Sequence, residues 1–236
     1  MAATLHQTQE LLDLAGIPVA IDGRDGPRTR FALAAYGHVC ADPLGAVFAD
    51  LASRGHPPVT ADPGATLSSV VVSVARWYLA AGAREVGGNN LGPWVRRFLG
   101  ADGPGCEWCA GFAWCTVVPE AEAILNVARA AAGLDPLRVA ASLRSASCTL
   151  VHEKARAAGR LVTDIARVRP GMGMLLPRDG AWHHTGIVEV VEPGSPLILT
   201  LEGNALDESD RGRSDRVARH VRDAVALGLA FVDLDR

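Results

Sequence analysis

The sequence lacks a surplus of charge of either sign and contains few aromatic residues. Its 236 residues include 23 Lys and Arg against 26 Asp and Glu, a formal net charge of −3, and only 5% are aromatic. Proteins that bind nucleic acid through its phosphates usually carry a basic surplus, so this balance argues against a nucleic-acid partner. The 49% of hydrophobic residues is enough for a packed core and argues against disorder.

Long apolar runs and export signals are also missing. No run reaches the roughly 18 apolar residues that a membrane span needs, since the nearest, over residues 67–83, is interrupted by serines and by Arg76. The start, MAATLHQTQELLDL, has no cationic segment followed by an apolar stretch, so we expect no signal peptide. Five cysteines is an odd number, which predicts at least one free thiol and disfavours a disulfide framework.

The chain divides into two predicted domains. Residues 1–57 show three short helical patterns ended by glycines and predict a small three-helix domain, and the proline-rich stretch over residues 58–64 predicts a linker. Residues 65–236 form the second domain. Its helical patterns span 65–83, 94–99, 109–133 and 138–159, and its short β patterns span 173–176, 185–191, 197–202 and 231–234. Helices followed by antiparallel strands predict an α+β fold, with Pro119 kinking or ending the third of these helices.

A cysteine- and tryptophan-rich segment, CEWCAGFAWC at residues 106–115, is the strongest candidate for chemistry. It follows a Gly-Pro-Gly turn and leads into an apolar helix, which places Cys109 at a helix N-terminus. Unpaired backbone N–H groups and the positive end of the helix dipole favour a thiolate there. The same N–H groups are suited to stabilising an oxyanion.

A base for this nucleophile is available in the β region. The segment WHHTGIV at residues 182–188 is followed by the turn Pro193-Gly194 and a second β pattern. A hairpin centred near 194 or 193 places His184 opposite Asn204 or Glu202, so both share its face, because side chains on a strand alternate with period two. His183 then faces the other side. Glu202 or Asn204 would orient His184 in a Cys-His-acid arrangement.

These motifs resemble a family of cell-wall enzymes. Trp108-Cys109-Ala110-x-Phe112, His184-x-Gly186 and Glu202-Gly203-Asn204, with an upstream segment EVGGNNLGP at 85–93, resemble the CHAP-type papain-like peptidases of bacterial peptidoglycan. The resemblance implies a papain-like domain in which helices pack on an antiparallel sheet. It implies Cys109 as nucleophile, His184 as general base, Glu202 as the orienting residue and Asn204 as an auxiliary polar group, with no cofactor and no metal. We expect Trp108, Trp182 and His183 to line the substrate cleft.

The N-terminal segment carries a second resemblance. Over residues 5–36, Gln9, Gly16, Asp22-Gly23, Gly26-Pro27 and Thr29 resemble a three-helix peptidoglycan-binding module. A wall-binding module joined to a wall-cutting domain implies a peptidoglycan amidase or endopeptidase, made in the cytoplasm and acting on the cell wall after delivery through a pore or secretion machine. A phage endolysin or an injected antibacterial effector fits this expectation, and an effector would imply a cognate immunity protein.

Other interpretations remain open at the level of sequence. Cys106-x-x-Cys109 resembles half of a zinc site, but the only other cysteine close to it in sequence is Cys115, and adjacent strand histidines point apart. A Cys-x-x-Cys redox motif would require a βαβ context that is missing. A non-catalytic wall-binding protein and a cysteine peptidase acting on a protein substrate are the remaining alternatives. Cys40, Cys115 and Cys148 are predicted to be structural, and Cys106 either a spectator or a thiol lining the cleft.

Overall fold

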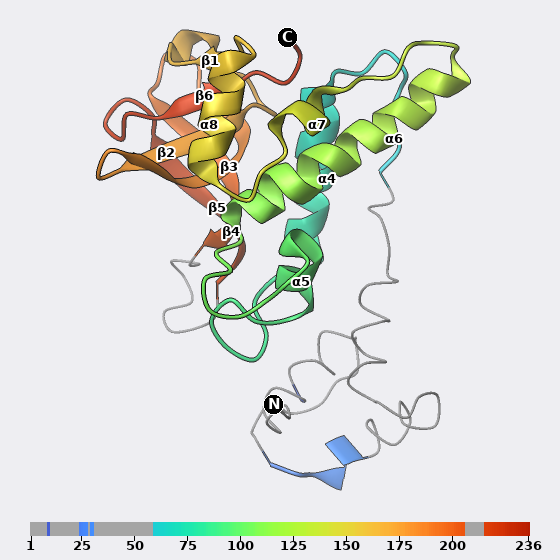
Figure 1. The fold of residues 1–236 in the computed structure, drawn as a ribbon, viewed down its shortest axis with the longest axis vertical. Coiled ribbons are helices and arrows are strands. Elements are labelled where there is room, and N and C mark those ends of the chain that lie inside the picture. Colours follow the sequence, from blue (N-terminus) through green and yellow to red (C-terminus); the bar gives the residue numbers. More distant parts are fainter. Residues whose placement is uncertain (1–8, 10–23, 28, 31–58, 206–214) are drawn as a thin grey trace.

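The computed structural model describes residues 9, 24–27, 29–30, 59–205 and 215–236 (Figure 1). The predicted N-terminal domain therefore lies almost wholly outside the described residues. Within the few that are described, the buried Gln9 amide donates to the Thr29 hydroxyl over 3.3 Å and to the Arg24 carbonyl over 2.9 Å. In the predicted linker, Val59 and Ala61 pack against the core of the second domain.

Within residues 65–236, the described residues form helices followed by a sheet, as the sequence predicts. The helical elements are α4 (Leu67–Ala80), α5 (Pro93–Leu99), the π-helix η1 (Gly111–Val117), α6 (Val118–Ala131), α7 (Val139–Leu143), α8 (Cys148–Ala157) and the 3-10 turn η2 (Ile165–Arg167). The strands are β1 (Leu161–Val162), β2 (Gly173–Arg178), β3 (Ala181–Val191), β4 (Leu197–Ala205), β5 (Arg216–Asp223) and β6 (Ala230–Val232). They form one six-stranded antiparallel sheet in the order β1-β6-β2-β3-β4-β5. The α+β prediction is confirmed.

Alternation along the strands divides the buried residues into two clusters. Leu175 and Ile187 belong to the main core beneath the helices, whereas their neighbours Met174 and Val188 belong to a second cluster. This is the period-two pattern of a sheet buried on both faces. Figure 1 shows α4 crossing α6 beside the sheet and α8 lying across it. The helices α4 and α8 and the π-helix η1 all pack against β3.

The helix that begins at Cys109 runs without a break to residue 131 and passes through a π-helical stretch just before Pro119. Residues 109–110 are α-helical, η1 follows, and the Val118 N–H donates to the carbonyl of Ala113, five residues back. Proline has no N–H to donate, and the change from π-helical to α-helical hydrogen bonding falls at this position, at the start of α6. Pro119 therefore does not end the helix, and the predicted kink stays a prediction.

One predicted helix is divided in the structure, and one strand was missed. The helix predicted over 138–159 is two helices, because the Ser147 hydroxyl accepts from the Leu150 N–H and starts α8 at Cys148. The strand β5 was not predicted, since its sequence RVARHVRD is dominated by charged residues. It pairs along β4 and forms one edge of the sheet.

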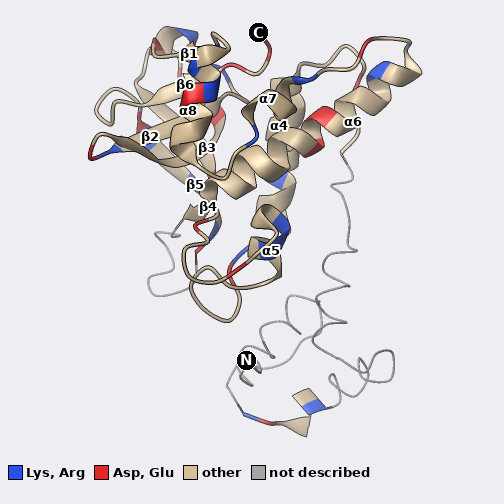
Figure 2. Cartoon of the chain, viewed as in Figure 1, with Lys and Arg blue, Asp and Glu red and all other residues tan. Residues whose placement is uncertain are grey.

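Charges are spread over the described elements. Figure 2 shows acidic and basic residues on the helices and on the sheet alike. A buried example is Glu189, whose carboxylate accepts from Arg76 of α4 and from Arg219 of β5 over 2.7–2.8 Å and so ties a helix to the sheet. Among the described helices, none is long and apolar enough to cross a membrane.

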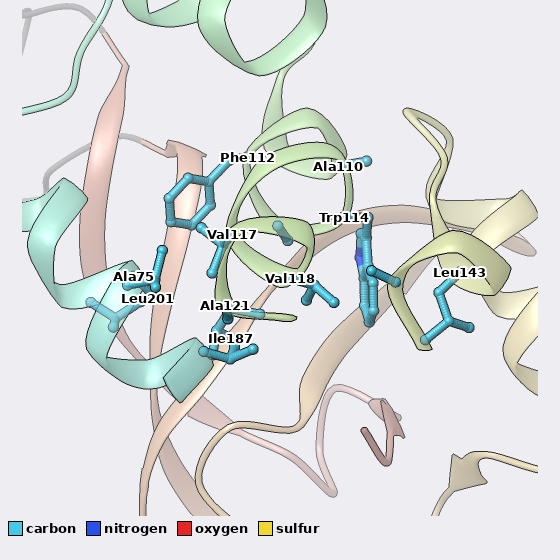
Figure 3. Close-up of a cluster of buried hydrophobic side chains, with 14 of the residues drawn as sticks. Ala75, Ala110, Phe112, Trp114, Val117, Val118, Ala121, Leu143, Ile187 and Leu201 are labelled. Atoms are coloured by element: carbon cyan, nitrogen blue, oxygen red, sulfur yellow. The ribbon is translucent and has the colours of Figure 1, made fainter. Parts of the chain in front are cut away.

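Trp114 fastens the helix of Cys109 to the sheet. Its indole N–H donates to the Thr185 hydroxyl of β3 over 2.9 Å, and that hydroxyl donates to the Met174 carbonyl of β2 over 2.6 Å. A Cβ atom at Gly173 would lie 2.3 Å from the Trp114 ring, so only glycine permits this approach. Figure 3 shows Trp114 in the same buried cluster as the strand residue Ile187.

Gly173→Ala is expected to lower the free energy of unfolding by about 3 kcal/mol, the upper end of the cost of overpacking a core. The added methyl group meets an aromatic ring that is itself held by a hydrogen bond. Urea unfolding followed by tryptophan fluorescence measures the change. Gly64→Ala is the matched control, because Gly64 is exposed and an added Cβ there meets only the end of the Asp62 side chain. Equal stability of the two variants would contradict the close packing of Trp114 on Gly173.

Candidate active site

Cys109 occupies the first position of its helix. The Phe112 N–H donates to the Trp108 carbonyl over 2.8 Å, so the N–H groups of residues 109–111 lie at the helix N-terminus ahead of the helical hydrogen-bond ladder. The Cys109 side chain is buried but not sealed, with 5% of the residue exposed. The Ala110 N–H interacts with the sulfur and favours its ionised form. The predicted placement of this cysteine at a helix N-terminus is confirmed.

The preceding residue, Trp108, is buried in the core next to the candidate nucleophile. Its ring is 0% exposed, stacks on Phe98 with centroids 5.2 Å apart, and donates its indole N–H to Glu85 over 3.1 Å. Glu85 also accepts from the Asn90 N–H over 2.8 Å. Trp108 was expected to line the cleft; a ring with no exposed surface does not contact substrate, so that expectation is wrong. Burial raises the pKa of Glu85.

His184 of β3 contacts Glu202 of β4. The imidazole Nε2 lies 2.8 Å from the Glu202 Oε2 atom. Gly186 pairs with Glu202 in the ladder, which is the register expected for a hairpin centred at 194; a bulge between Val188 and Val190 shifts the pairing nearer the turn. Because Nε2 is engaged by the carboxylate, Nδ1 is the nitrogen left to face Cys109.

Glu202 is the most heavily bonded carboxylate of the site. It has no exposed surface and accepts from the Arg222 guanidinium at both oxygens, over 2.9 Å at Oε1 and 2.6 Å at Oε2, and from the Thr200 hydroxyl over 2.6 Å. Burial by itself would raise the pKa of Glu202, but Arg222 and His184 hold it well below the usual range. A buried ionised carboxylate with this many donors is both charged and fixed in place.

Arg222 and Thr200 were missed at the level of sequence. Arg222 belongs to β5, the strand that was not predicted, and it pairs with Ile198 rather than with Glu202 in the ladder. The only signal available was the alternation of residues in β5, which places His220 and Arg222 on one side of that strand. Thr200 lies two residues before Glu202 and so shares its face of β4.

The charges of Cys109 and His184 depend on each other. A hydrogen bond with the Cys148 thiol, together with the His184 imidazole, lowers the pKa of Cys109 to about 5 although burial opposes this. Burial would lower the pKa of His184, but its interactions with Cys109 and Glu202 raise it to about 9. Between these two values the pair is a thiolate and an imidazolium, the reactive form of a cysteine nucleophile.

The remaining predicted site residues lie around this centre without joining it. Asn204 has a φ of 55° at a bulge of β4, and its Oδ1 atom has no hydrogen-bond partner among the described residues. Glu202 rather than Asn204 therefore orients His184. Trp182 is half-buried and stacks on His152 with centroids 4.5 Å apart, and His183 is exposed. Both lie on the strand that bears the imidazole, so their expected place at the cleft stays a prediction.

Two glycines make room for this arrangement. A Cβ atom at Gly186 would lie 2.7 Å from Glu202 Cγ and 2.8 Å from the Leu201 carbonyl oxygen. A Cβ atom at Gly203 would lie 2.7–2.8 Å from Phe112 and Trp108, on the segment that carries Cys109. Glycine at these positions lets the carboxylate reach across to His184 and lets β4 approach the start of the helix.

In the part of the chain that the structure describes, no group of three or more His, Cys, Asp or Glu side chains is arranged to hold a metal ion. The described cysteines Cys106, Cys109, Cys115 and Cys148 are free thiols. Burial raises the pKa of Cys115, which lies on the same helix as Cys109 and interacts with Arg144 and Lys154. Comparison with family models, curated proteins and solved structures finds no match to this chain.

The pH dependence of alkylation tests the ion pair. In the wild type, reaction of Cys109 with iodoacetamide is expected to rise with a midpoint near pH 5, following its pKa of about 5. An imidazolium favours the thiolate, so His184→Gln raises the pKa and moves the midpoint upward by about one unit or more. Mass spectrometry of the labelled peptide measures the rate at Cys109 itself, with Cys115 in the same peptide as an internal reference. An unmoved midpoint in His184→Gln would show that the imidazole does not act on the thiol.

Arg222→Met is expected to destabilise the protein by on the order of 3 kcal/mol, because it removes the guanidinium that bonds both oxygens of the buried Glu202 carboxylate and leaves only the His184 imidazolium as a charged partner. Adding Glu202→Gln to that variant removes the charge that needs a partner and should restore part of the loss. Denaturant unfolding of the single and double variants gives the coupling between the two residues. If the losses of unfolding free energy in the single variants simply add in the double variant, Arg222 and Glu202 do not stabilise each other.

Proposed function

We propose that this protein is a cysteine hydrolase that cleaves an amide bond of bacterial peptidoglycan. Cys109 is the nucleophile, His184 the general base and acid, and Glu202 the residue that orients the imidazole. The observation that carries the proposal is the contact of His184 with a fully buried Glu202 beside a helix N-terminal thiol of lowered pKa. These are the groups that a thiol acyl-transfer mechanism requires, and the Cys109 thiol and the His184 imidazole lie near enough for each to shift the pKa of the other.

The first half of the reaction forms a thioester. The Cys109 thiolate attacks the carbonyl carbon of the scissile amide, and the negative charge moves to the carbonyl oxygen. The backbone N–H groups at the start of the helix are suited to stabilise this oxyanion. Collapse of the tetrahedral intermediate breaks the C–N bond, and the His184 imidazolium gives its proton to the leaving amine.

The second half returns the enzyme to its starting state. Neutral His184 takes a proton from water, and the resulting hydroxide attacks the thioester carbonyl. The C–S bond breaks, the acid product leaves, and the thiolate and imidazolium are regenerated. Glu202 stays ionised throughout because Arg222 and Thr200 continue to donate to it, and it holds Nε2 of the ring so that Nδ1 serves the reaction.

The choice of peptidoglycan as substrate is supported by the sequence rather than by the site. The motifs around Cys109, His184 and Glu202 resemble CHAP-type peptidases, and the N-terminal segment resembles a peptidoglycan-binding module. Two bonds fit: the amide between muramic acid and L-alanine, and an amide within the stem peptide. A wall-binding module in the same chain favours the wall over a protein substrate.

Digestion of purified sacculi tests the function. The wild type is expected to release soluble fragments, and Cys109→Ala to release none above background, a loss of about a thousandfold or more. Mass spectrometry distinguishes the two bonds, since an amidase frees intact stem peptides and an endopeptidase cuts within them. Cys115→Ala is the matched control on the same helix and should retain activity. Sacculi of several chemotypes left intact by the wild type, but bound by it, would favour a wall-binding protein; cleavage of a protein substrate alone would favour the peptidase alternative.

A further inference from the structure

A second thiol lies against the candidate nucleophile. The sulfur of Cys148 is 3.9 Å from the sulfur of Cys109, within the range of a hydrogen bond to sulfur, and the two residues are 39 positions apart in sequence. Cys148 is the first residue of α8, where the Ser147 N-cap fixes the helix start. The break between α7 and α8, absent from the sequence prediction, is therefore what brings this thiol to the site.

The two sulfurs differ in charge. Cys109 has a lowered pKa, whereas its hydrogen bond to Cys109, followed by burial, raises the pKa of Cys148. Cys148 is accordingly a neutral thiol that donates to a thiolate. A low-pKa thiolate with a second cysteine in contact is the arrangement of thiols that oxidise reversibly, because the neighbour resolves the first oxidation product.

The other described cysteines do not share this contact. Within the described residues, neither Cys106 nor Cys115 makes a sulfur–sulfur contact with Cys109, although both lie within six positions of it in sequence. Cys115 is instead near Arg144 and Lys154. Among the described cysteines, the one whose sulfur contacts Cys109 is therefore Cys148, although Cys106 and Cys115 are nearer in sequence.

We propose that Cys109 and Cys148 form a reversible oxidation site, in which a peroxide oxidises Cys109 and Cys148 resolves it to a disulfide. This goes beyond hydrolysis: it depends on the nucleophilicity of Cys109 and on its contact with Cys148, and it needs no wall substrate. It also replaces the purely structural role expected for Cys148. Since the disulfide consumes the nucleophile, the oxidised protein cannot carry out the proposed hydrolysis until a thiol reductant restores the Cys109 thiol.

The chemistry balances with a hydroperoxide as oxidant. The Cys109 thiolate attacks one oxygen of hydrogen peroxide, the O–O bond breaks, and the departing hydroxide takes the proton of the His184 imidazolium to form water, leaving a sulfenic acid. The Cys148 sulfur then attacks the Cys109 sulfur and the S–O bond breaks. The hydroxide that leaves takes the Cys148 proton, so two thiols and one peroxide give one disulfide and two waters.

Resolution has a protective consequence. Without a resolving thiol, a sulfenic acid is oxidised further to sulfinic and sulfonic acids, which thiol reductants do not reverse. Once Cys109 is no longer a thiolate, the interaction that raises the Cys148 pKa is removed, so the resolving thiol becomes easier to ionise. The pair is therefore suited to trap the first oxidation product quickly.

The test treats the full-length protein with hydrogen peroxide and follows iodoacetamide labelling of Cys109 and the masses of tryptic peptides. Trypsin places Cys109 in the peptide 98–129 and Cys148 in the peptide 145–154. In the wild type, peroxide is expected to link these two peptides with the loss of two hydrogens, to abolish labelling of Cys109, and to allow dithiothreitol to restore it. Fragmentation of the linked species identifies which of the three cysteines in peptide 98–129 is bonded to Cys148.

Two variants make the result specific. Cys148→Ser keeps the size and a hydrogen-bond donor but removes the resolving sulfur, so peroxide should drive Cys109 to sulfinic and sulfonic acids and dithiothreitol should restore less than a tenth of the labelling. Cys106→Ser is the matched control and should behave as the wild type. Circular dichroism and thermal unfolding establish that Cys148→Ser is folded.

The proposal is overturned if the linked cysteine is Cys106 or Cys115, if peroxide gives no intramolecular disulfide, or if a folded Cys148→Ser variant recovers fully with dithiothreitol. None of these readouts uses peptidoglycan. An absence of wall hydrolysis would therefore leave this result standing, and failure of the disulfide would leave the hydrolase proposal untouched.

Discussion

The close approach of one helix to one sheet underlies every contact of the candidate site. Trp114 lies against Gly173 and donates to Thr185, and Gly203 lies against Phe112 and Trp108, so the start of the helix comes within reach of β3 and β4. A side chain larger than hydrogen at either glycine would push the helix away. The thiol and the imidazole come from these two elements, so their meeting is a consequence of this docking.

Electrostatic interactions then set the protonation states of Glu202, His184 and Cys109. A buried carboxylate is stable only when donors surround it, and Glu202 has Arg222, Thr200 and His184. Its fixed negative charge favours the imidazolium, and the imidazolium favours the thiolate. Cys148 adds a second hydrogen-bonding partner for the sulfur, from α8. Charge at Cys109 therefore depends on residues from β3, β4, β5 and α8 together.

Much of the framework follows from local sequence. The helix start at Cys109 was predictable from the Gly-Pro-Gly turn before it, and the face shared by His184 and Glu202 from the period of a strand. The break before Cys148 was harder, because it depends on a single serine cap within an otherwise helical pattern. The strand β5 escaped prediction because its charged side chains pair with buried carboxylates, Arg219 with Glu189 and Arg222 with Glu202, a pairing that no local pattern reveals.

The sequence by itself therefore determined that helices come before an antiparallel sheet, that a cysteine stands at a helix N-terminus, and that a histidine and a carboxylate share one face of a hairpin. Periodicity, capping and turn chemistry act between residues close in the chain, so they can be read there. Only the tertiary structure decided that Glu202 rather than Asn204 contacts His184, that Trp108 lies in the core, and that Arg222 and Cys148 complete the site. Those contacts join residues 18 to 39 positions apart, and they depend on how closely helix and sheet pack, which no local pattern encodes.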